Sequence, residues 1–156
     1  MELPGGLDIG SLALFVGFAA AERVREGMAG EGYGDLRFSH GYVFQHLIEE
    51  EPAISELAAR LEMTQQGASK VVAELEGRGY VERFPSPSDA RVRRVRLTSR
   101  GRDAVAAARR IRAGQEEALA AEYGAERLAE ARALLVGLLE TLGGAEAVRR
   151  RSVSPP

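Results

Sequence analysis

The chain has 156 residues, of which 45% are hydrophobic and 28% are charged, and its net charge is −2. This composition is ordinary for one globular domain, or for one core with additional helices, and it argues against wholesale disorder. The sequence contains no cysteine, which excludes disulfides, a thiol redox switch and thiolate metal sites.

The longest apolar run near the start spans residues 12–21, is interrupted by Gly17 and is followed by Glu22 and Arg23. It is too short to cross a bilayer. It also lacks the basic leader and cleavage pattern of a signal peptide. We therefore expect a cytoplasmic protein with no membrane partner.

Charge is distributed unevenly along the chain. Residues 1–60 carry ten acidic and four basic side chains, whereas residues 80–112 carry three acidic and ten basic ones. A local basic segment steers a polyanion more than the net charge does. Lys70 is the only lysine. The bias toward arginine is typical of a GC-rich genome, although arginine also suits phosphate forks and groove insertion.

Helical periodicity and strand-like alternation predict the secondary structure. In chain order, we expect helices over residues 8–28 and 39–50, a short helix over 55–61, a helix over 64–78, strands over 80–84 and 92–98, and helices over 99–122 and 126–142. The predicted caps are Asp8 or Ser11, Ser39, Ser55 and Thr64. Gly30, Gly79 and Gly124 are expected at helix ends.

This order predicts a mainly α fold with a small β-hairpin wing, in which a winged helix–turn–helix lobe lies between flanking helices. In the second helix of that motif, Ala68, Leu75 and either Val71 or Val72 are expected to pack on the preceding short helix. The opposite side of the helix is then left for a partner.

Several polar residues of the helix–turn–helix are of types that read DNA. Glutamine can bond adenine through two hydrogen bonds, serine can meet bases or phosphate, and lysine can meet phosphate or guanine. A helix N-terminus adds backbone donors for phosphate. Taken alone, these residues are equally compatible with a solvated helix face. The residues expected at DNA are Ser55, Thr64, Gln65, Gln66, Ser69 and Lys70.

The predicted hairpin adds a second contact surface. An arginine on a protruding hairpin can enter a narrow minor groove, where the negative potential is enhanced. Asp89 is two residues from Arg91 and is expected to stabilise the turn or to orient that arginine. Strand alternation cannot place three arginines on one face. We therefore expect Arg93 or Arg94 at phosphate and Arg96 on the free surface.

Three features of residues 79–101, in this order, resemble the MarR (multiple antibiotic resistance regulator) family. They are Gly-Tyr-Val-Glu-Arg at 79–83, then Pro87, Asp89 and Arg91 at alternate positions, then Leu-Thr-x-x-Gly at 97–101. The match, with the preceding helix–turn–helix, covers about residues 39–112. Outside that range the helices are similar to the family only in placement and character.

The resemblance implies a homodimer that binds a pseudo-palindromic site on double-stranded DNA, with ligands that commonly relieve repression. It implies that the helix over 64–77 is recognition-like, that Arg91 contacts the minor groove and that Asp89 supports it. Two departures matter: Ala90 stands where the family frequently has a basic residue, and Gly67 where it usually has a better helix former. Base preferences are therefore not transferred.

The resemblance also implies the domain boundaries. We expect residues 39–98 to form the DNA-binding lobe, residues 8–38 and 99–148 a helical dimerisation region, and residues 149–156 a flexible tail. For the C-terminal helices an intramolecular bundle is the alternative to a dimer seam.

Effectors of this family often bind in the crevice between the dimer helices and the DNA-binding lobe. The candidate effector pocket is Phe15, Phe18, His40, Tyr42 and Phe44. His40 and His46 are six residues apart, and no cysteine or histidine cluster accompanies them, so no metal is expected.

Neighbouring polar residues of one helix point in different directions, so a nucleophile–base set is not expected either. The sequence thus predicts no catalytic residue and no cofactor. It predicts a ligand-responsive repressor that binds DNA. The alternative is a winged-helix protein–protein interaction module without sequence-specific DNA binding.

Overall fold

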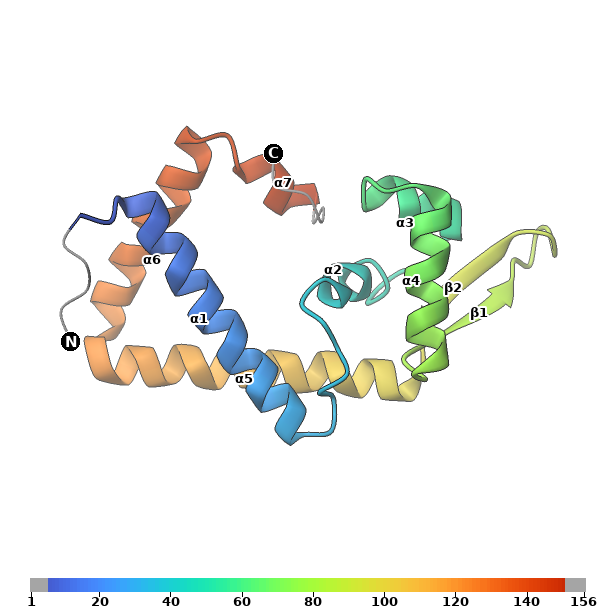
Figure 1. The fold of residues 1–156 in the computed structure, drawn as a ribbon, viewed down its shortest axis with the longest axis horizontal. Coiled ribbons are helices and arrows are strands. Elements are labelled where there is room, and N and C mark those ends of the chain that lie inside the picture. The colour runs from blue at the N-terminus through green and yellow to red at the C-terminus, as the bar shows by residue number, and fades with distance from the viewer. Residues whose placement is uncertain (1–5, 151–156) are drawn as a thin grey trace.

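A computed structural model describes residues 6–150 of the chain, and Figure 1 shows a long helix, α5, with a winged lobe at one end and further helices at the other. The helices are α1 (Ile9–Gly30), α2 (His40–Gln45), α3 (Ile54–Arg60), α4 (Gln65–Gly77), α5 (Ser99–Tyr123), α6 (Ala125–Thr141) and α7 (Ala145–Arg150), and the strands are β1 (Val81–Pro85) and β2 (Arg93–Leu97). The predicted mainly α fold with a β-hairpin wing is confirmed.

Two predicted side-chain caps begin helices. Asp8 Oδ1 accepts the N–H of Ser11 at 3.0 Å at the start of α1. Thr64 Oγ1 accepts the N–H of Gly67, also at 3.0 Å, at the start of α4. Each bond satisfies a backbone donor that has no partner within its helix. At Gly124 the backbone has φ 92°, a left-handed conformation that favours glycine and separates α5 from α6.

α2 is shorter than the helix predicted over residues 39–50. Ser39 occupies the cap position without a side-chain capping bond, and the helix ends at Gln45. Just beyond it, the N–H of Leu47 donates to the carbonyl of Phe44 at 2.9 Å, which is the tighter three-residue bond of a turn. The chain then leaves the helical direction before Pro52.

α3 begins at Ile54, and the prediction that Ser55 caps it is wrong. The N-cap is Ala53, whose N–H donates to Glu56 Oε2 at 2.8 Å, while Ser55 is already inside the helix. Ala53 is held extended because it forms a β-bridge with Arg94 of β2. A tertiary pairing, which no local pattern encodes, therefore sets the start of this helix.

The C-terminal end also differs from the prediction. α7 extends to Arg150, so the tail predicted over residues 149–156 begins within a helix, and its flexibility stays a prediction. Residues 151–156 lie outside the described part of the chain.

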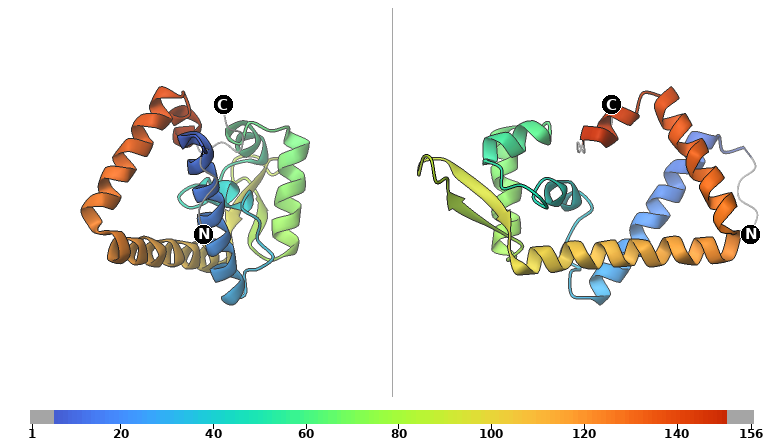
Figure 2. Two further views of the ribbon diagram at one scale, coloured as in Figure 1. Left: turned by 60° about the vertical axis from the view of Figure 1, so that its left-hand side comes forward. Right: turned by 180° about the vertical axis from the view of Figure 1, so that it is seen from behind.

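The core lies within the winged lobe and under the first half of α5. Leu57, Val72, Leu75 and Tyr80 are all fully buried there. Burial of a large apolar side chain stabilises a fold by about 1.5–3 kcal/mol. By contrast, α6 contributes no buried residue, and Figure 2 shows it standing away from the winged lobe.

β1 and β2 pair antiparallel, with Val81 opposite Leu97 at the core end and Pro85 opposite Arg93 toward the tip. At the core end, Thr98 caps α5 and its hydroxyl donates to the carbonyl of Gly79 at 2.6 Å. The hairpin is thereby anchored where it meets the start of α5, and its tip projects from the lobe (Figure 1).

Candidate nucleic-acid interface

α4 buries one face and leaves another open. Ala68, Val72 and Leu75 are buried, so Val72 rather than Val71 completes the packed face. The opposite side carries exposed Gln65, Gln66 and Lys70, with Ser69 half-buried beside them. Within residues 6–150 none of these four side chains makes a hydrogen bond or ion pair. They form a polar helix face that is open to a partner.

Two further predicted residues flank this face. Thr64 is exposed, but its hydroxyl oxygen is engaged in capping α4. Ser55 is exposed in the first turn of α3. Gly67 gives the Thr64 cap room, because a Cβ there would lie 3.1 Å from Thr64 Oγ1.

The wing presents Arg91 on a turn that Asp89 stabilises. Asp89 Oδ1 accepts the N–H of Arg91 at 2.9 Å, and Asp89 O accepts the N–H of Val92 at 3.0 Å. Such a side-chain bond to the backbone two residues on is an Asx turn. The guanidinium of Arg91 is exposed, and among the described residues it has no partner.

The three arginines of β2 have different surroundings. Arg93 is exposed, with no side-chain partner in the described part of the chain. Arg94 donates from Nε to the carbonyl of Glu51 at 2.5 Å. Arg96 pairs with Glu82 at 2.6 Å and its guanidinium stacks 4.6 Å from the centre of the Phe84 ring. Arg93 is thus the strand arginine most available to phosphate.

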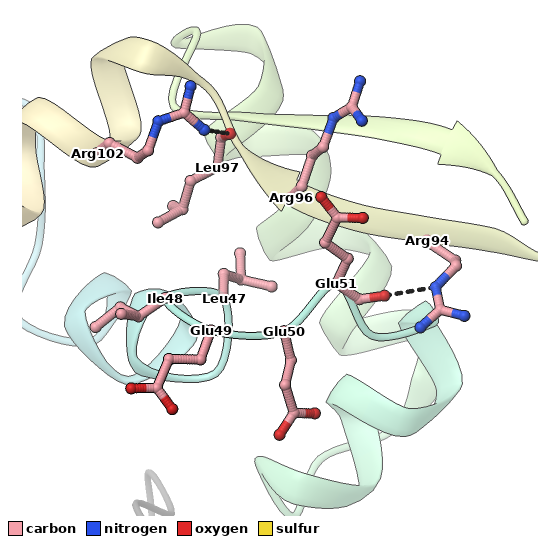
Figure 3. A pocket seen from close by; sticks show the side chains of 9 residues that line it. All are labelled: Leu47, Ile48, Glu49, Glu50, Glu51, Arg94, Arg96, Leu97 and Arg102. Carbon is pink, nitrogen blue, oxygen red and sulfur yellow. Dashed lines mark hydrogen bonds between the residues drawn. The ribbon is translucent and has the colours of Figure 1, made fainter.

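Figure 3 shows an open pocket of about 510 Å³ behind the wing, between β2, the start of α5 and the segment after α2. Its lining residues are Leu47, Ile48, Glu49, Glu50, Glu51, Arg94, Arg96, Leu97 and Arg102. Three carboxylates and three guanidiniums share this lining, and Arg102 already donates to the carbonyl of Leu97 at 2.8 Å. Because acidic and basic side chains are equal in number, the pocket favours neither an anionic nor a cationic ligand.

The structure does not bring the five candidate effector residues together. Phe15 and Phe18 are more than half exposed on α1, where their ring centres lie 6.4 Å apart. Phe44 is buried and packs against Tyr80, because the chain needs an apolar side chain there to complete the core. Tyr42 is partly buried and packs against the core.

His40 belongs to a polar cluster that the sequence analysis missed. We define the junction cluster as Asp35 and Arg37 from the connection between α1 and α2, His40 at the start of α2, Glu74 from α4, and Arg78, which caps the C-terminal end of α4. Arg37 forms an ion pair with Glu74, and Arg78 lies 2.6 Å from the same carboxylate. Glu74 and Arg78 are an i,i+4 pair, but Arg37 and Glu74 are 37 residues apart, so neither periodicity nor a motif could have joined them.

Acidic pH is expected to destabilise the protein through His40, which is 1% exposed. Burial, and then the charge of Arg37, lowers the pKa of His40 below its ordinary value of 6.5. The unfolded ring therefore protonates at a higher pH than the native ring. The stability that neutral His40 contributes is present above about pH 6.5 and is lost as the pH falls below it.

Thermal melts between about pH 7 and pH 5 test this expectation. Relative to His40→Gln, the wild type should lose melting temperature as the pH falls, whereas His46→Gln should follow the wild type. Equal pH dependence of His40→Gln and the wild type would contradict it.

Neither a metal site nor a membrane-spanning helix is found among residues 6–150. No group of histidine, aspartate and glutamate among residues 6–150 could hold a metal ion. Over the same residues, every helix is too short or too polar to span a membrane. The features that stand out are the open face of α4 and the arginine-bearing wing. Together they define a winged helix–turn–helix protein.

Comparison with known proteins agrees with this class. Residues 35–92 match the model of the MarR family. A mutant of MepR from S. aureus, 18% identical, aligns over 87% of this chain and 99% of its own with a TM-score of 0.70. FabT of Streptococcus pneumoniae, solved in complex with DNA, is 22% identical over 85% of this chain and 92% of its own, with a TM-score of 0.66.

The transcriptional repressor CouR, bound to a 23-mer DNA duplex, is 25% identical over 92% of this chain and 99% of its own, with a TM-score of 0.67. Among curated proteins there is no match. The predicted resemblance to the MarR family is confirmed, and the fold is that of the MarR winged-helix proteins. Proteins of that family are transcription regulators and not enzymes.

Proposed function

We propose that this chain is a cytoplasmic, ligand-responsive transcription repressor that binds a pseudo-palindromic operator on duplex DNA as a homodimer. The observation that carries this function is the pairing of an open polar face on α4 with a wing that presents Arg91 without a protein partner. Related folds in complex with DNA, those of FabT and CouR, support it.

In this function α4 lies in the major groove, where Gln65, Gln66, Ser69 and Lys70 meet bases and phosphates. The first turn of α4 offers backbone donors to a phosphate. Arg91 enters the minor groove next to it, and Arg93 meets the backbone. Most of the affinity comes from phosphate neutralisation, while the base contacts and the wing provide specificity.

The dimer is supported by apolar side chains that one subunit leaves in solvent. α1 and α6 carry a series of large hydrophobic residues that are more than a third exposed: Leu12, Leu14, Phe15, Val16, Phe18, Leu134, Leu135, Val136 and Leu139. Large apolar side chains exposed in such number on two helices mark an interaction site. We place a second copy on it, so residues 8–38 and 99–148 form the dimerisation region and residues 39–98 the DNA-binding lobe.

Ligand response is part of the proposal and works through a population shift. A ligand that favours one spacing of the two α4 helices relieves DNA binding tenfold with about 1.4 kcal/mol of coupling. Phe15, Phe18 and Tyr42 stay the candidate effector residues. Phe44, which packs in the core, and His40, which is 1% exposed and bonded to Arg37, are left out.

The test is a salt titration of binding to the duplex upstream of the coding region, with random duplex beside it. We expect a steep fall in affinity with salt, because each neutralised phosphate releases counterions. Arg91→Ala should weaken binding by about 1–3 kcal/mol, the range of a good groove contact.

Arg96→Ala is the matched control, since Arg96 is occupied by Glu82 and Phe84. It should change DNA affinity much less than Arg91→Ala. No retention of a folded dimer on any duplex at low salt would refute the proposed function and favour a winged-helix module that binds a protein instead.

A further inference from the structure

The C-terminal half of α4 is fastened to the connection between α1 and α2 by the junction cluster. This connection follows directly from α1, which ends at Gly30. The lower end of α4 and the start of α5 also meet at the bottom of Figure 1. The helix that would read DNA is therefore attached here to the two helices that would carry the dimer.

Glu74 is the centre of the cluster. Its carboxylate pairs with Arg37 of the connection through one oxygen and with Arg78 at 2.6 Å through the other. Although partial burial opposes ionisation, the charges of Arg37 and Arg78 hold the pKa of Glu74 below its ordinary value. The carboxylate is thus ionised at neutral pH and lies between two guanidiniums. That of Arg37 comes from outside α4.

His40 completes the contact from the connection. Its Nδ1 accepts the N–H of Arg37 at 3.0 Å. Nε2 lies 3.8 Å from Glu74 Oε2 and 3.1 Å from the guanidinium of Arg37. A second proton would break the Nδ1 bond and place a positive charge beside Arg37 and Arg78.

Two further bonds tie the same connection to the end of α4 and to α5. Arg78 donates to the carbonyl of Asp35, and the Tyr80 hydroxyl donates to Asp35 Oδ1 at 2.6 Å. Arg100 of α5 donates to the Tyr80 hydroxyl at 3.0 Å. Each of these groups lies away from the open face of α4, so none is free to read DNA itself.

We propose that Glu74 is a positioning residue for DNA binding, which holds α4 against the connection through Arg37 and His40 and so sets the angle at which α4 meets DNA. Base-reading side chains must lie within roughly 0.5 Å and 10–20° of their productive geometry. A rigid helix transmits a change at Glu74 to Lys70, one turn away, and to Gln66, two turns away. The inference rests on the proposed function.

The Glu74→Gln variant tests this inference, because the change in DNA affinity that we expect is opposite to the one that the change in charge alone would cause. Removing a negative charge near a polyanion should tighten DNA binding. We expect the opposite for a duplex selected from random sequence by the wild-type dimer: affinity should fall about tenfold or more, as when a bidentate base contact is misaligned. Binding to unselected duplex should be unchanged or tighter.

Glu76→Gln is the matched control. It makes the same charge change on the same helix, but Glu76 pairs with Arg83 at 2.6 Å, which lies within the winged lobe. This variant should bind the selected duplex as tightly as the wild type or more tightly. Melting temperature and oligomeric state are measured for every variant, so that loss of fold is recognised.

Arg37→Gln removes the other partner of the same ion pair. Because Arg37 is 59% exposed, its replacement leaves no cavity. Its effect on affinity should not add to that of Glu74→Gln, because either change alone breaks the pair. Additive effects, or a Glu74→Gln variant that binds the selected duplex as Glu76→Gln does, would overturn the inference and leave the proposed function standing. A wild type that enriches no duplex would refute the proposed function and, with it, this inference.

The pH profile supplies a further readout, over the pH range in which the melting temperatures show that every variant is folded. His40 is faced by Arg37, Glu74 and Arg78, and its protonation would break the hydrogen bond that Nδ1 accepts from the N–H of Arg37. Between about pH 7.5 and pH 5.5, affinity of the wild type for the selected duplex should fall relative to that of His40→Gln. Parallel profiles would show that His40 has no part in positioning α4.

Discussion

Gly101→Ala is expected to unfold the winged lobe or to destabilise it by more than about 3 kcal/mol, at the upper end of overpacking costs. A Cβ at this position would lie far inside van der Waals contact with the carbonyl oxygen of Tyr80, and 3.1 Å from Leu97 Cδ2. The obstacle is backbone, which cannot rotate away as a side chain can.

The carbonyl of Tyr80 is held in place and cannot move away from an added methyl group. It accepts the N–H of Thr98 at 3.1 Å, and Tyr80 itself is fully buried. The side chain of Thr98 meanwhile caps α5 through the N–H of Gly101. The glycine of the Leu-Thr-x-x-Gly motif is therefore required where the start of α5 passes the turn between α4 and β1, and a methyl group would have to separate the two.

Urea denaturation checks this expectation, with Gly114→Ala as the control on the same helix. A Cβ at Gly114 would meet nothing within 4 Å. Alanine there should stabilise the protein by about 0.5–1 kcal/mol, because it restricts the unfolded chain and favours helix. If the free energy of unfolding of Gly101→Ala were within about 1 kcal/mol of the wild-type value, the close approach to Tyr80 would not require glycine in solution.

Replacing Leu135 and Leu139 together with aspartate is expected to produce a folded monomer that binds its operator at least about a hundredfold more weakly, because the second lobe no longer adds its contacts. The two residues are four apart on α6, so they lie on one face of it. They are 47% and 38% exposed in one subunit, and α6 buries no residue of its own. Two carboxylates on a dimer seam would be desolvated without partners.

Light scattering during size-exclusion chromatography measures the mass, and anisotropy measures the DNA affinity. Val92→Asp is the control for the mass, because Val92 is 39% exposed and lies on the wing, within the proposed DNA-binding lobe. It should remain dimeric. A wild type that is monomeric at micromolar concentration, or a double variant that stays dimeric, would overturn the proposed seam and favour the intramolecular alternative.

Local rules in the sequence were sufficient for most of the elements. Asp8 and Thr64 cap helices because a side-chain oxygen can reach a backbone N–H three residues on. Gly124 separates α5 from α6 because its left-handed backbone favours glycine. Val81–Pro85 and Arg93–Leu97 pair as a hairpin because Asp89 turns the chain between them. The order of these elements, with the wing motif, also pointed to the MarR family.

The sequence by itself thus determined the element order, the open polar face of α4, the wing turn with Arg91 at its tip, and the family resemblance. Only the tertiary structure decided that Ala53 rather than Ser55 begins α3, that Phe44 packs in the core, and that Glu74 joins α4 to the connection through Arg37. The physical reason is the separation along the chain. Caps, turns and periodicity act within about four residues, as in a helical turn, whereas these contacts join distant segments; Arg37 and Glu74, for example, are 37 residues apart.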